Sequence, residues 1–260
     1  MYDVEKLREK VMAINANQKL AVLIDADNDT SKIVSELFEE VSRYGTATIK
    51  RAYGNWTTPH LGGWKDVLHT QAIQPIQQFS YTTGKNATDS ALIIDAMDVL
   101  HTGRVDGFCL VSSDSDFTRL ATRIREAGLM VYGFGKRSTP AAFQAACDKF
   151  IYTEILRNEP EESKIDQEPV AELPKLKPIL LNALNVTARE DGWTTLAVLG
   201  GQISRSHPSF DPRNYGVAKL GELIRQQAAY LEVKEVKTGE GDLVQTHLHV
   251  RRRVGSAVKS

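Results

Sequence analysis

Four short acidic segments in the first half of the chain contain the side chains best suited to chemistry. The sequence reads IDADN at 24–28, KNATD at 85–89, IDAMD at 94–98 and SSDSD at 112–116. The first and last segments overlap or follow apolar runs typical of buried parallel strands. The carboxyl ends of such strands face the ligand crevice of an open α/β sheet, and carboxylates gathered there repel one another unless a divalent cation binds. We therefore expect metal-assisted phosphoryl chemistry.

The first segment offers two candidate residues. Asp25 ends an apolar strand, so its carboxylate needs a partner to offset the cost of desolvation. Asn28 lies in the turn that follows, where an amide can orient a water molecule or a phosphate. Asp27 is a secondary candidate, because capping of the next helix is the simpler explanation for an acid there.

Two segments belong to one expected helix, residues 88–103, with Thr88 as its N-cap. Asp89 is in the first turn of this helix, close to the strand ends. Asp95 lies six residues further on, and at about 100° per residue the two side chains cannot point the same way. We expect Asp89 to be the metal ligand and keep Asp95 as a secondary candidate.

The last segment, SSDSDF at 112–117, is the most specific motif. Asp114 leaves a strand and Asp116 enters a helix, so one turn presents both acids to the crevice. Ser113 and Ser115 can donate hydrogen bonds to phosphate oxygens or bound water. Helix capping is the alternative explanation, but it would not require two acids.

Basic and aromatic residues surround these acids. A groove that alternates cations with aromatic rings suits single-stranded nucleic acid. Trp56 and Trp64 are equally well explained as packing residues. The expected contacts to the substrate backbone are Arg51, Lys85, Arg119 and Lys136.

The first 155 residues alternate between strand and helix patterns, which predicts an α/β fold. We expect a three-layer, Rossmann-like arrangement, in which helices cover both faces of a parallel sheet. The expected strands are 20–25, 46–54, 72–79, 108–113, 129–135 and 149–155. The expected helices are 31–45, 61–70, 88–103, 115–128 and 139–147.

The chain divides by composition into four parts. Residues 1–156 form the expected catalytic domain, and 157–174 are rich in proline and acidic residues, as linkers are. Residues 175–250 show three amphipathic helices and then a strand pair, which is the pattern of a small winged-helix-like module. A basic tail, 251–260, follows.

The composition narrows the class of protein. Hydrophobic residues make up 42% and charged residues 25%, as in soluble globular proteins. The net charge of -1 excludes a uniformly basic nucleic-acid binder. The two cysteines, Cys109 and Cys147, show no CxxC spacing. With neither a signal peptide nor a membrane span in the pattern, we expect a cytoplasmic protein without membrane contact.

Residues 18–153 resemble the NYN domain family, relatives of PIN-type ribonucleases. The resemblance rests on IDADN, on KNATDSALIIDAMD, and on LVSSDSDFTRLATRIREAG followed by VYGFG. It implies a nuclease that acts on RNA with Mg²⁺ or Mn²⁺ as cofactor. The family's acidic metal site matches Asp25, Asp89, Asp114 and Asp116, and its polar residue after the first strand matches Asn28.

Residues 175–250 are similar to the OST-HTH (LOTUS) domain. The matching pairs are Gly192-Trp193, Phe210-Asp211 and Tyr215-Gly216. We interpret their aromatic side chains as core residues. The resemblance implies binding of RNA or docking of a partner protein, with Arg205, Arg213 and Lys219 as candidate contacts.

We expect a metal-dependent ribonuclease that hydrolyses single-stranded RNA, and two alternatives stay open. IDADNDT partly matches the DxDx[TV] signature of haloacid-dehalogenase-type phosphatases, in which the first Asp is a nucleophile, but residue 29 is Asp. The other alternative is a non-catalytic adaptor that binds RNA or protein. The sequence leaves the oligomeric state open, a homodimer included.

Overall fold

The computed structural model describes residues 18–27, 31–79, 87–157, 173–238 and 245–253. The chain separates into two compact units, Met1–Ala171 and Glu172–Ser260. Each unit has its own hydrophobic core, and each is described by itself.

The first unit contains a six-stranded sheet in which every neighbouring pair is parallel. Its strand order is β3-β2-β1-β4-β5-β6. The strands are β1 (Lys19–Asp25), β2 (Thr46–Gly54), β3 (Gln74–Gln77), β4 (Gly107–Val111), β5 (Met130–Gly135) and β6 (Lys149–Tyr152). The sheet confirms the predicted parallel α/β fold.

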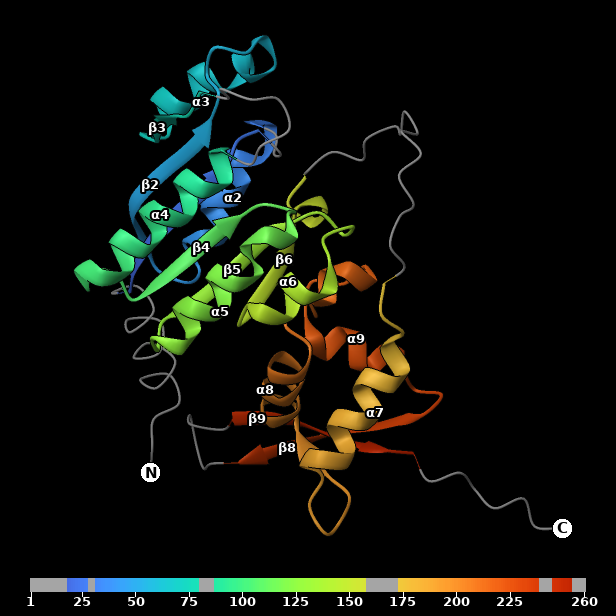
Figure 1. Ribbon diagram of the computed structural model, residues 1–260. Coiled ribbons are helices and arrows are strands. Elements are labelled where there is room, and N and C mark those ends of the chain that lie inside the picture. Colours follow the sequence, from blue (N-terminus) through green and yellow to red (C-terminus); the bar gives the residue numbers. More distant parts are fainter. Residues whose placement is uncertain (1–17, 28–30, 80–86, 158–172, 239–244, 254–260) are drawn as a thin grey trace, which may run out of the picture. The chain divides into compact units, whose positions relative to one another are not determined.

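Helices cover both faces of this sheet. Figure 1 shows α4 and α5 in front of the strands and α2 behind them. The helices are α2 (Val34–Val41), α3 (Trp64–Thr70), α4 (Ala87–Thr102), α5 (Thr118–Glu126) and α6 (Ala141–Ala146). The described residues of this unit also form short 3₁₀ turns: η1 (Ser31–Ile33), η2 (Pro59–Gly63), η3 (Ser115–Phe117) and, after β6, η4 (Thr153–Ile155).

The central strands are apolar along their whole length because both of their faces are covered. Six of the seven residues of β1 are buried. Leu20, Val22 and Ile24 alternate toward one face and share a core cluster with Leu37 and Val41 of α2. Burial of this kind contributes about 1.5–3 kcal/mol per large apolar side chain. It holds the end of β1, and therefore Asp25, in a fixed place.

Local details both confirm and correct the expectations. Gly103 follows the end of α4 with a φ of 61°, as expected for a C-terminal glycine. Thr88 lies inside α4, so it is not the N-cap that we predicted. β3 covers only four of the eight residues expected, and it contains Pro75, which an edge strand tolerates because one side of its backbone makes no ladder hydrogen bonds.

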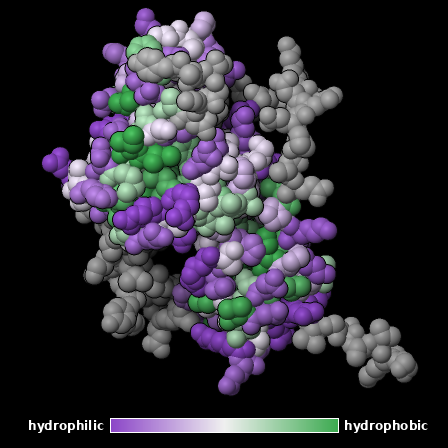
Figure 2. All heavy atoms as spheres, viewed as in Figure 1, coloured by the Kyte–Doolittle hydropathy of each residue, from purple (hydrophilic) through white to green (hydrophobic). Residues whose placement is uncertain are grey.

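The surface of the first unit is not uniformly polar. Figure 2 shows hydrophobic residues gathered on the face where α4 and α5 lie. On α4, Ile94 is 63% exposed while Leu92 and Ala96 are buried. This helix therefore carries apolar residues on its outer surface as well as on its buried side.

The second unit has three helices and a small antiparallel sheet, as the sequence pattern predicts. The elements are α7 (Leu176–Thr187), β7 (Thr194–Thr195), α8 (Leu196–Ser206), η5 (Pro212–Tyr215), α9 (Leu220–Gln226), β8 (Leu231–Thr238) and β9 (Gln245–Arg252). The strand order is β7-β9-β8. Trp193 is buried and Phe210 packs against the core, which agrees with their interpretation as core residues.

Two further expectations concern the cysteines and membrane-spanning helices. Both cysteines are buried and neither forms a disulfide. Among the described residues, none of the helices has the length and apolar character needed to span a bilayer.

Candidate functional site

The site lies where the order of the strands changes direction across the sheet, between β1 and β4. β1 pairs with β2 on one side and with β4 on the other, so the strand order runs outward in both directions from the β1–β4 pair. In open α/β sheets, ligands bind outside the carboxyl ends of the strands at such a switch point. Asp25 ends β1, and the SSDSD turn follows β4.

Asp25 is fully buried at this point. Its Oδ2 accepts a hydrogen bond of 2.9 Å from the Ser112 hydroxyl, which comes from the neighbouring strand end. The desolvation cost of a buried carboxylate is thus offset in part by a hydrogen bond to a charged group, a class worth about 1.5–3 kcal/mol. Asp25 is therefore held inside the protein, away from solvent.

The turn after β4 is fixed by its own hydrogen bonds. Ser112 Oγ accepts the Asp114 backbone N–H at 3.1 Å while it donates to Asp25. The Asp114 side chain then accepts the Asp116 N–H at 2.9 Å and caps η3. Ser113 Oγ accepts the Lys136 N–H at 2.9 Å, which ties the turn to the end of β5. These bonds determine where the two acids point.

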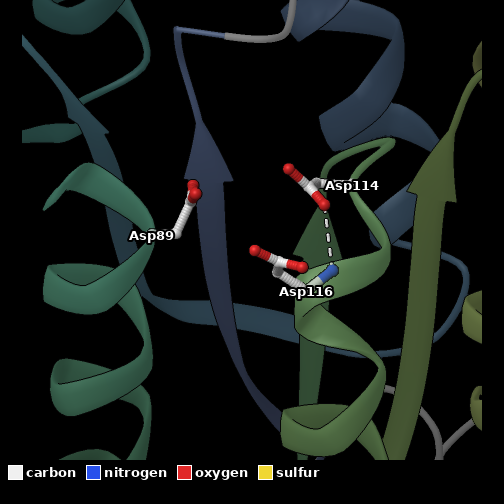
Figure 3. Close-up of side chains that lie close together, drawn as sticks. All are labelled: Asp89, Asp114 and Asp116. Carbon is white, nitrogen blue, oxygen red and sulfur yellow. Dashed lines mark hydrogen bonds between the residues drawn. The ribbon is translucent and has the colours of Figure 1, made fainter. Parts of the chain in front are cut away.

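Three carboxylates converge in front of this turn. Asp89, Asp114 and Asp116 each offer an oxygen, and these oxygens lie within 4.8 Å of one another. Figure 3 shows Asp89 reaching from α4 toward Asp114 and Asp116, with the dashed bond joining the latter two. Asp89 is buried, Asp114 is half-buried and Asp116 is exposed. The group therefore opens to solvent on the side of Asp116.

The electrostatics of Asp89 reflect this crowding. Burial, and after it the charges of Asp25, Asp114, Asp116 and Asp27 in that order, together raise the pKa of Asp89 from 3.8 to about 6. The negative charges of four other acids thus reach the Asp89 carboxyl group. A divalent cation bound among these carboxylates would reduce their mutual repulsion.

Asp27 acts on Asp89 as well and is held by contacts from two other segments. Its Oδ2 accepts the Thr88 hydroxyl at 2.8 Å, and its Oδ1 accepts the Asn55 N–H at 3.3 Å. The His60 ring nitrogen lies 3.8 Å from Oδ1. These contacts join the end of β1 to α4 and to the segment after β2, while the turn at 28–30, where Asp27 would cap the next helix, lies outside the described residues.

Asp95 and Arg51 lie apart from the cluster and pair with each other. Arg51 Nη1 is 2.9 Å from Asp95 Oδ2, and the same oxygen accepts the Tyr53 hydroxyl at 2.7 Å. Burial and then the Asp95 hydrogen bond and charge raise the pKa of Tyr53. Asp95 thus points away from Asp89, as the helical spacing predicts, and it ties α4 to β2.

The remaining candidates lie around the turn or outside the described residues. Ser115, Arg119 and Lys136 are exposed. Asn28 and Lys85 belong to segments outside the described residues. In the second unit, Arg213 forms a salt bridge of 2.7 Å with Asp211, whereas Arg205 and Lys219 are exposed.

Two side chains position the acids in a way that we did not predict from the sequence. Ser112 holds both Asp25 and the Asp114 backbone, and Thr88 holds Asp27. The signal for Ser112 was its place directly after a buried strand, opposite an acid that ends the neighbouring strand. Thr88 gave no such signal, because helix capping explained a threonine at that position and its bond to Asp27 forms only when α4 packs beside the end of β1.

Comparison with known families agrees with this geometry. The model of the NYN domain matches residues 19–156. The chain belongs to the NYN domain family. The model of the OST-HTH/LOTUS domain matches residues 171–242, so a LOTUS domain follows the NYN domain.

Two solved structures are similar to parts of this chain. A protein of unknown function from Vibrio parahaemolyticus is 20% identical, with 52% of this chain and 93% of that chain covered and a TM-score of 0.43. An uncharacterized protein from Nitrosomonas europaea is 21% identical, with 40% and 97% covered and a TM-score of 0.30. No curated protein matches the chain.

Proposed function

We propose that this protein is a metal-dependent ribonuclease that hydrolyses phosphodiester bonds in single-stranded RNA. The observation that carries the proposal is the convergence of Asp89, Asp114 and Asp116 at the switch point of a NYN domain. The LOTUS domain would serve as an accessory module that binds RNA or a partner protein.

The donor set fits Mg²⁺ or Mn²⁺. All three groups are carboxylates, which hard divalent cations prefer, and burial and the neighbouring acids raise the pKa of Asp89, so a bound cation would relieve their repulsion. Asp89, Asp114 and Asp116 would hold the cation, and the buried Asp25 would add negative charge behind them. When bound, such a cation lowers the pKa of a water molecule and neutralises charge that grows on the phosphate.

The protein's own residues fix the positions of the carboxylates and leave one side of the site open to water. Ser112 fixes the turn through its two hydrogen bonds, so Asp114 and Asp116 need no rearrangement to meet Asp89. Asp116 is the most exposed of the three. A water molecule entering from solvent meets it first, and its carboxylate can accept a hydrogen bond from that water. Preorganisation of this kind is where most of the protein's contribution to hydrolysis would lie.

Contacts to the RNA backbone would come from basic residues near the turn. Arg119 and Lys136 are exposed, so their charges are available to phosphates. Ser113 and Ser115 flank them, and Lys85 completes the set that we predicted. Arg51 would act indirectly, because its guanidinium is engaged by Asp95.

The phosphatase alternative requires Asp25 as a nucleophile. Asp25 is 0% exposed and accepts a hydrogen bond from Ser112, so the described residues bury the carboxylate that would have to attack a substrate phosphorus atom. We therefore do not propose that activity. The adaptor alternative predicts RNA binding without cleavage, which the following experiment separates.

The test is cleavage of single-stranded RNA by the purified full-length chain with Mg²⁺ or Mn²⁺, followed by EDTA. We expect cleavage that EDTA stops, and a loss on the order of 100-fold or more in Asp116→Asn. Asp98→Asn, an exposed acid on α4, is the matched control and should retain activity. Chelator-resistant cleavage, or full activity in Asp114→Asn, would overturn the proposal. Tight RNA binding without cleavage under either metal would favour the adaptor.

A further inference from the structure

A pocket of about 590 Å³ lies between η2, α3 and β3 in the NYN domain. Its walls are mainly hydrophobic, and its size falls within the range of roughly 300–1,000 Å³ typical of ligand sites. The lining includes Trp56, Leu61, Leu68, Ile73 and Pro75. None of the described residues that line it is acidic, although the neighbouring cluster consists of acids.

The pocket is joined to the acidic site by a chain of hydrogen bonds. Gln77, in the pocket wall, donates through its Nε2 to Asn55 Oδ1 at 3.0 Å. Asn55 donates its backbone N–H to Asp27, which accepts the hydroxyl of Thr88, the residue before Asp89. These hydrogen bonds link the pocket wall to the first turn of α4, which carries Asp89.

The aromatic wall of the pocket is rigid. Trp56 donates its indole N–H to the Ile76 carbonyl at 2.9 Å and its backbone N–H to Gln77 Oε1 at 3.0 Å. Its ring also packs edge-on against Trp64, with centroids 6.2 Å apart. An indole held in this way loses little entropy when a flat ligand packs against it.

Lys65 brings a positive charge to the rim of the pocket. Lys65 and His69 both line it and both are exposed on α3. A hydrophobic interior with an aromatic wall and a cationic rim matches a nucleobase attached to a phosphate backbone. The hydrogen-bonded link to a cluster suited to phosphoryl chemistry favours that ligand over an apolar peptide, because the same RNA strand would supply the phosphodiester.

We propose that this pocket binds one unstacked base of a single-stranded RNA, beside the phosphodiester that faces Asp89, Asp114 and Asp116. Lys65 would contact the backbone phosphate at the rim. The inference rests on the proposed ribonuclease function and adds to it a site that selects the position of cleavage.

The test uses Gly62, an exposed residue of the pocket lining where an added Cβ meets no atom within 4 Å. Gly62→Phe should occupy the pocket without disturbing the core, and Gly62→Ala is the matched control. The probe is a short single-stranded RNA of mixed sequence, intact or with one abasic position moved along it. Binding to the full-length chain is measured by fluorescence anisotropy in EDTA, where cleavage does not occur.

We expect one abasic position to weaken binding roughly 10-fold, as loss of a stacked base does. Gly62→Phe should weaken binding of the intact RNA by a similar factor and remove the effect of that abasic position, while Gly62→Ala changes neither. Lys65→Glu should weaken binding more than Arg123→Glu, the same charge change at an exposed site on α5.

The outcomes separate the pocket from the catalytic proposal. An abasic effect that depends on Gly62, without cleavage under Mg²⁺ or Mn²⁺, supports the pocket and overturns the ribonuclease. Metal-dependent cleavage with equal binding at every abasic position overturns the pocket alone. Equal binding of intact RNA by Gly62→Phe and Gly62→Ala also overturns it, as does a protein that binds no RNA.

Discussion

At the scale of single residues, a small number of hydrogen bonds keeps several negatively charged side chains close together. Asp25, fully buried, and Asp89, nearly so, face the same region as Asp114 and Asp116. One hydroxyl, that of Ser112, meets both the deepest acid and the turn that carries the outer two. Repulsion between the carboxylates opposes their convergence, and the hydrogen bonds of Ser112 favour it. Substitutions can test the two effects separately.

The raised pKa of Asp89 predicts a pH dependence of stability in the metal-free protein. Its folded pKa is about 6 and its ordinary value is 3.8. Between about pH 4 and pH 6 the folded state therefore binds more protons than the unfolded state, so the free energy of unfolding falls as pH rises. Asp89→Asn removes this penalty and should stabilise the metal-free protein by about 1–3 kcal/mol above pH 7.

Urea unfolding in EDTA across this pH range measures the effect. Asp98→Asn, on the exposed side of the same helix, should leave the pH profile unchanged. Addition of Mg²⁺ should stabilise the wild type and leave Asp89→Asn nearly unaffected. A variant as pH-dependent as the wild type would contradict the assignment of the penalty to Asp89.

Ser112→Ala should destabilise the protein by about 1.5–3 kcal/mol, because it leaves the buried carboxylate of Asp25 without this donor. It should also weaken Mg²⁺ binding, since the Asp114 N–H loses its acceptor. Chemical unfolding and metal titration report the two effects. Ser115→Ala, an exposed serine of the same turn, is the control, and equal losses in both variants would exclude a special role for Ser112.

At the scale of elements, the switch point brings together segments that are far apart in the chain. β1 and β4 are neighbours although more than 80 residues separate them, and α4 delivers Asp89 to the same edge. The Arg51–Asp95 pair and the Asp27–Thr88 bond both tie α4 to the strands beneath it. The position of the helix is therefore set by contacts outside the carboxylate group itself.

Close packing between β5 and the turn after β4 predicts a sensitive glycine. A Cβ at Gly135 would stand 2.6 Å from the Ser112 carbonyl oxygen and 2.8 Å from Thr139 Oγ1. Gly135→Ala should therefore push the turn outward, cost about 1–3 kcal/mol and reduce metal affinity. Gly62→Ala, the same substitution where nothing lies within 4 Å, is the control for unfolding and metal titration. Unchanged metal affinity in Gly135→Ala would show that the turn adapts.

At the scale of the whole molecule, the NYN and LOTUS domains have separate cores. Leu37 belongs to the first core and Leu180 to the second, and both are almost completely buried. The proline-rich, acidic stretch at 157–174, which we interpret as a linker, lies between the two domains. The two domains should therefore respond independently to damage in their cores.

Calorimetry of the full-length chain tests this independence. Leu37→Ala and Leu180→Ala should each cost about 2–5 kcal/mol in their own domain. Each should lower one unfolding transition by several degrees and leave the other in place. Parallel shifts of both transitions in either variant would show that the domains unfold together.

The sequence by itself determined the fold class and the candidate acids, because these depend on local pattern. Apolar runs of strand length, each followed by an acid, indicate buried parallel strands that end at a ligand crevice. Helical spacing was enough to separate Asp89 from Asp95. The family resemblance then pointed to the same residues, and the match to the NYN domain confirmed the family.

Only the tertiary structure decided which acids meet and what holds them. Asp25 lies fully buried, and the three carboxylates with oxygens within 4.8 Å are those of Asp89, Asp114 and Asp116. Asp27 and Arg51 have partners on elements that are distant in the chain, at Thr88 and Asp95. Such pairings depend on strand order and on packing between elements. Spacing along a single chain does not encode them, because any one residue can face several neighbours until the sheet is assembled.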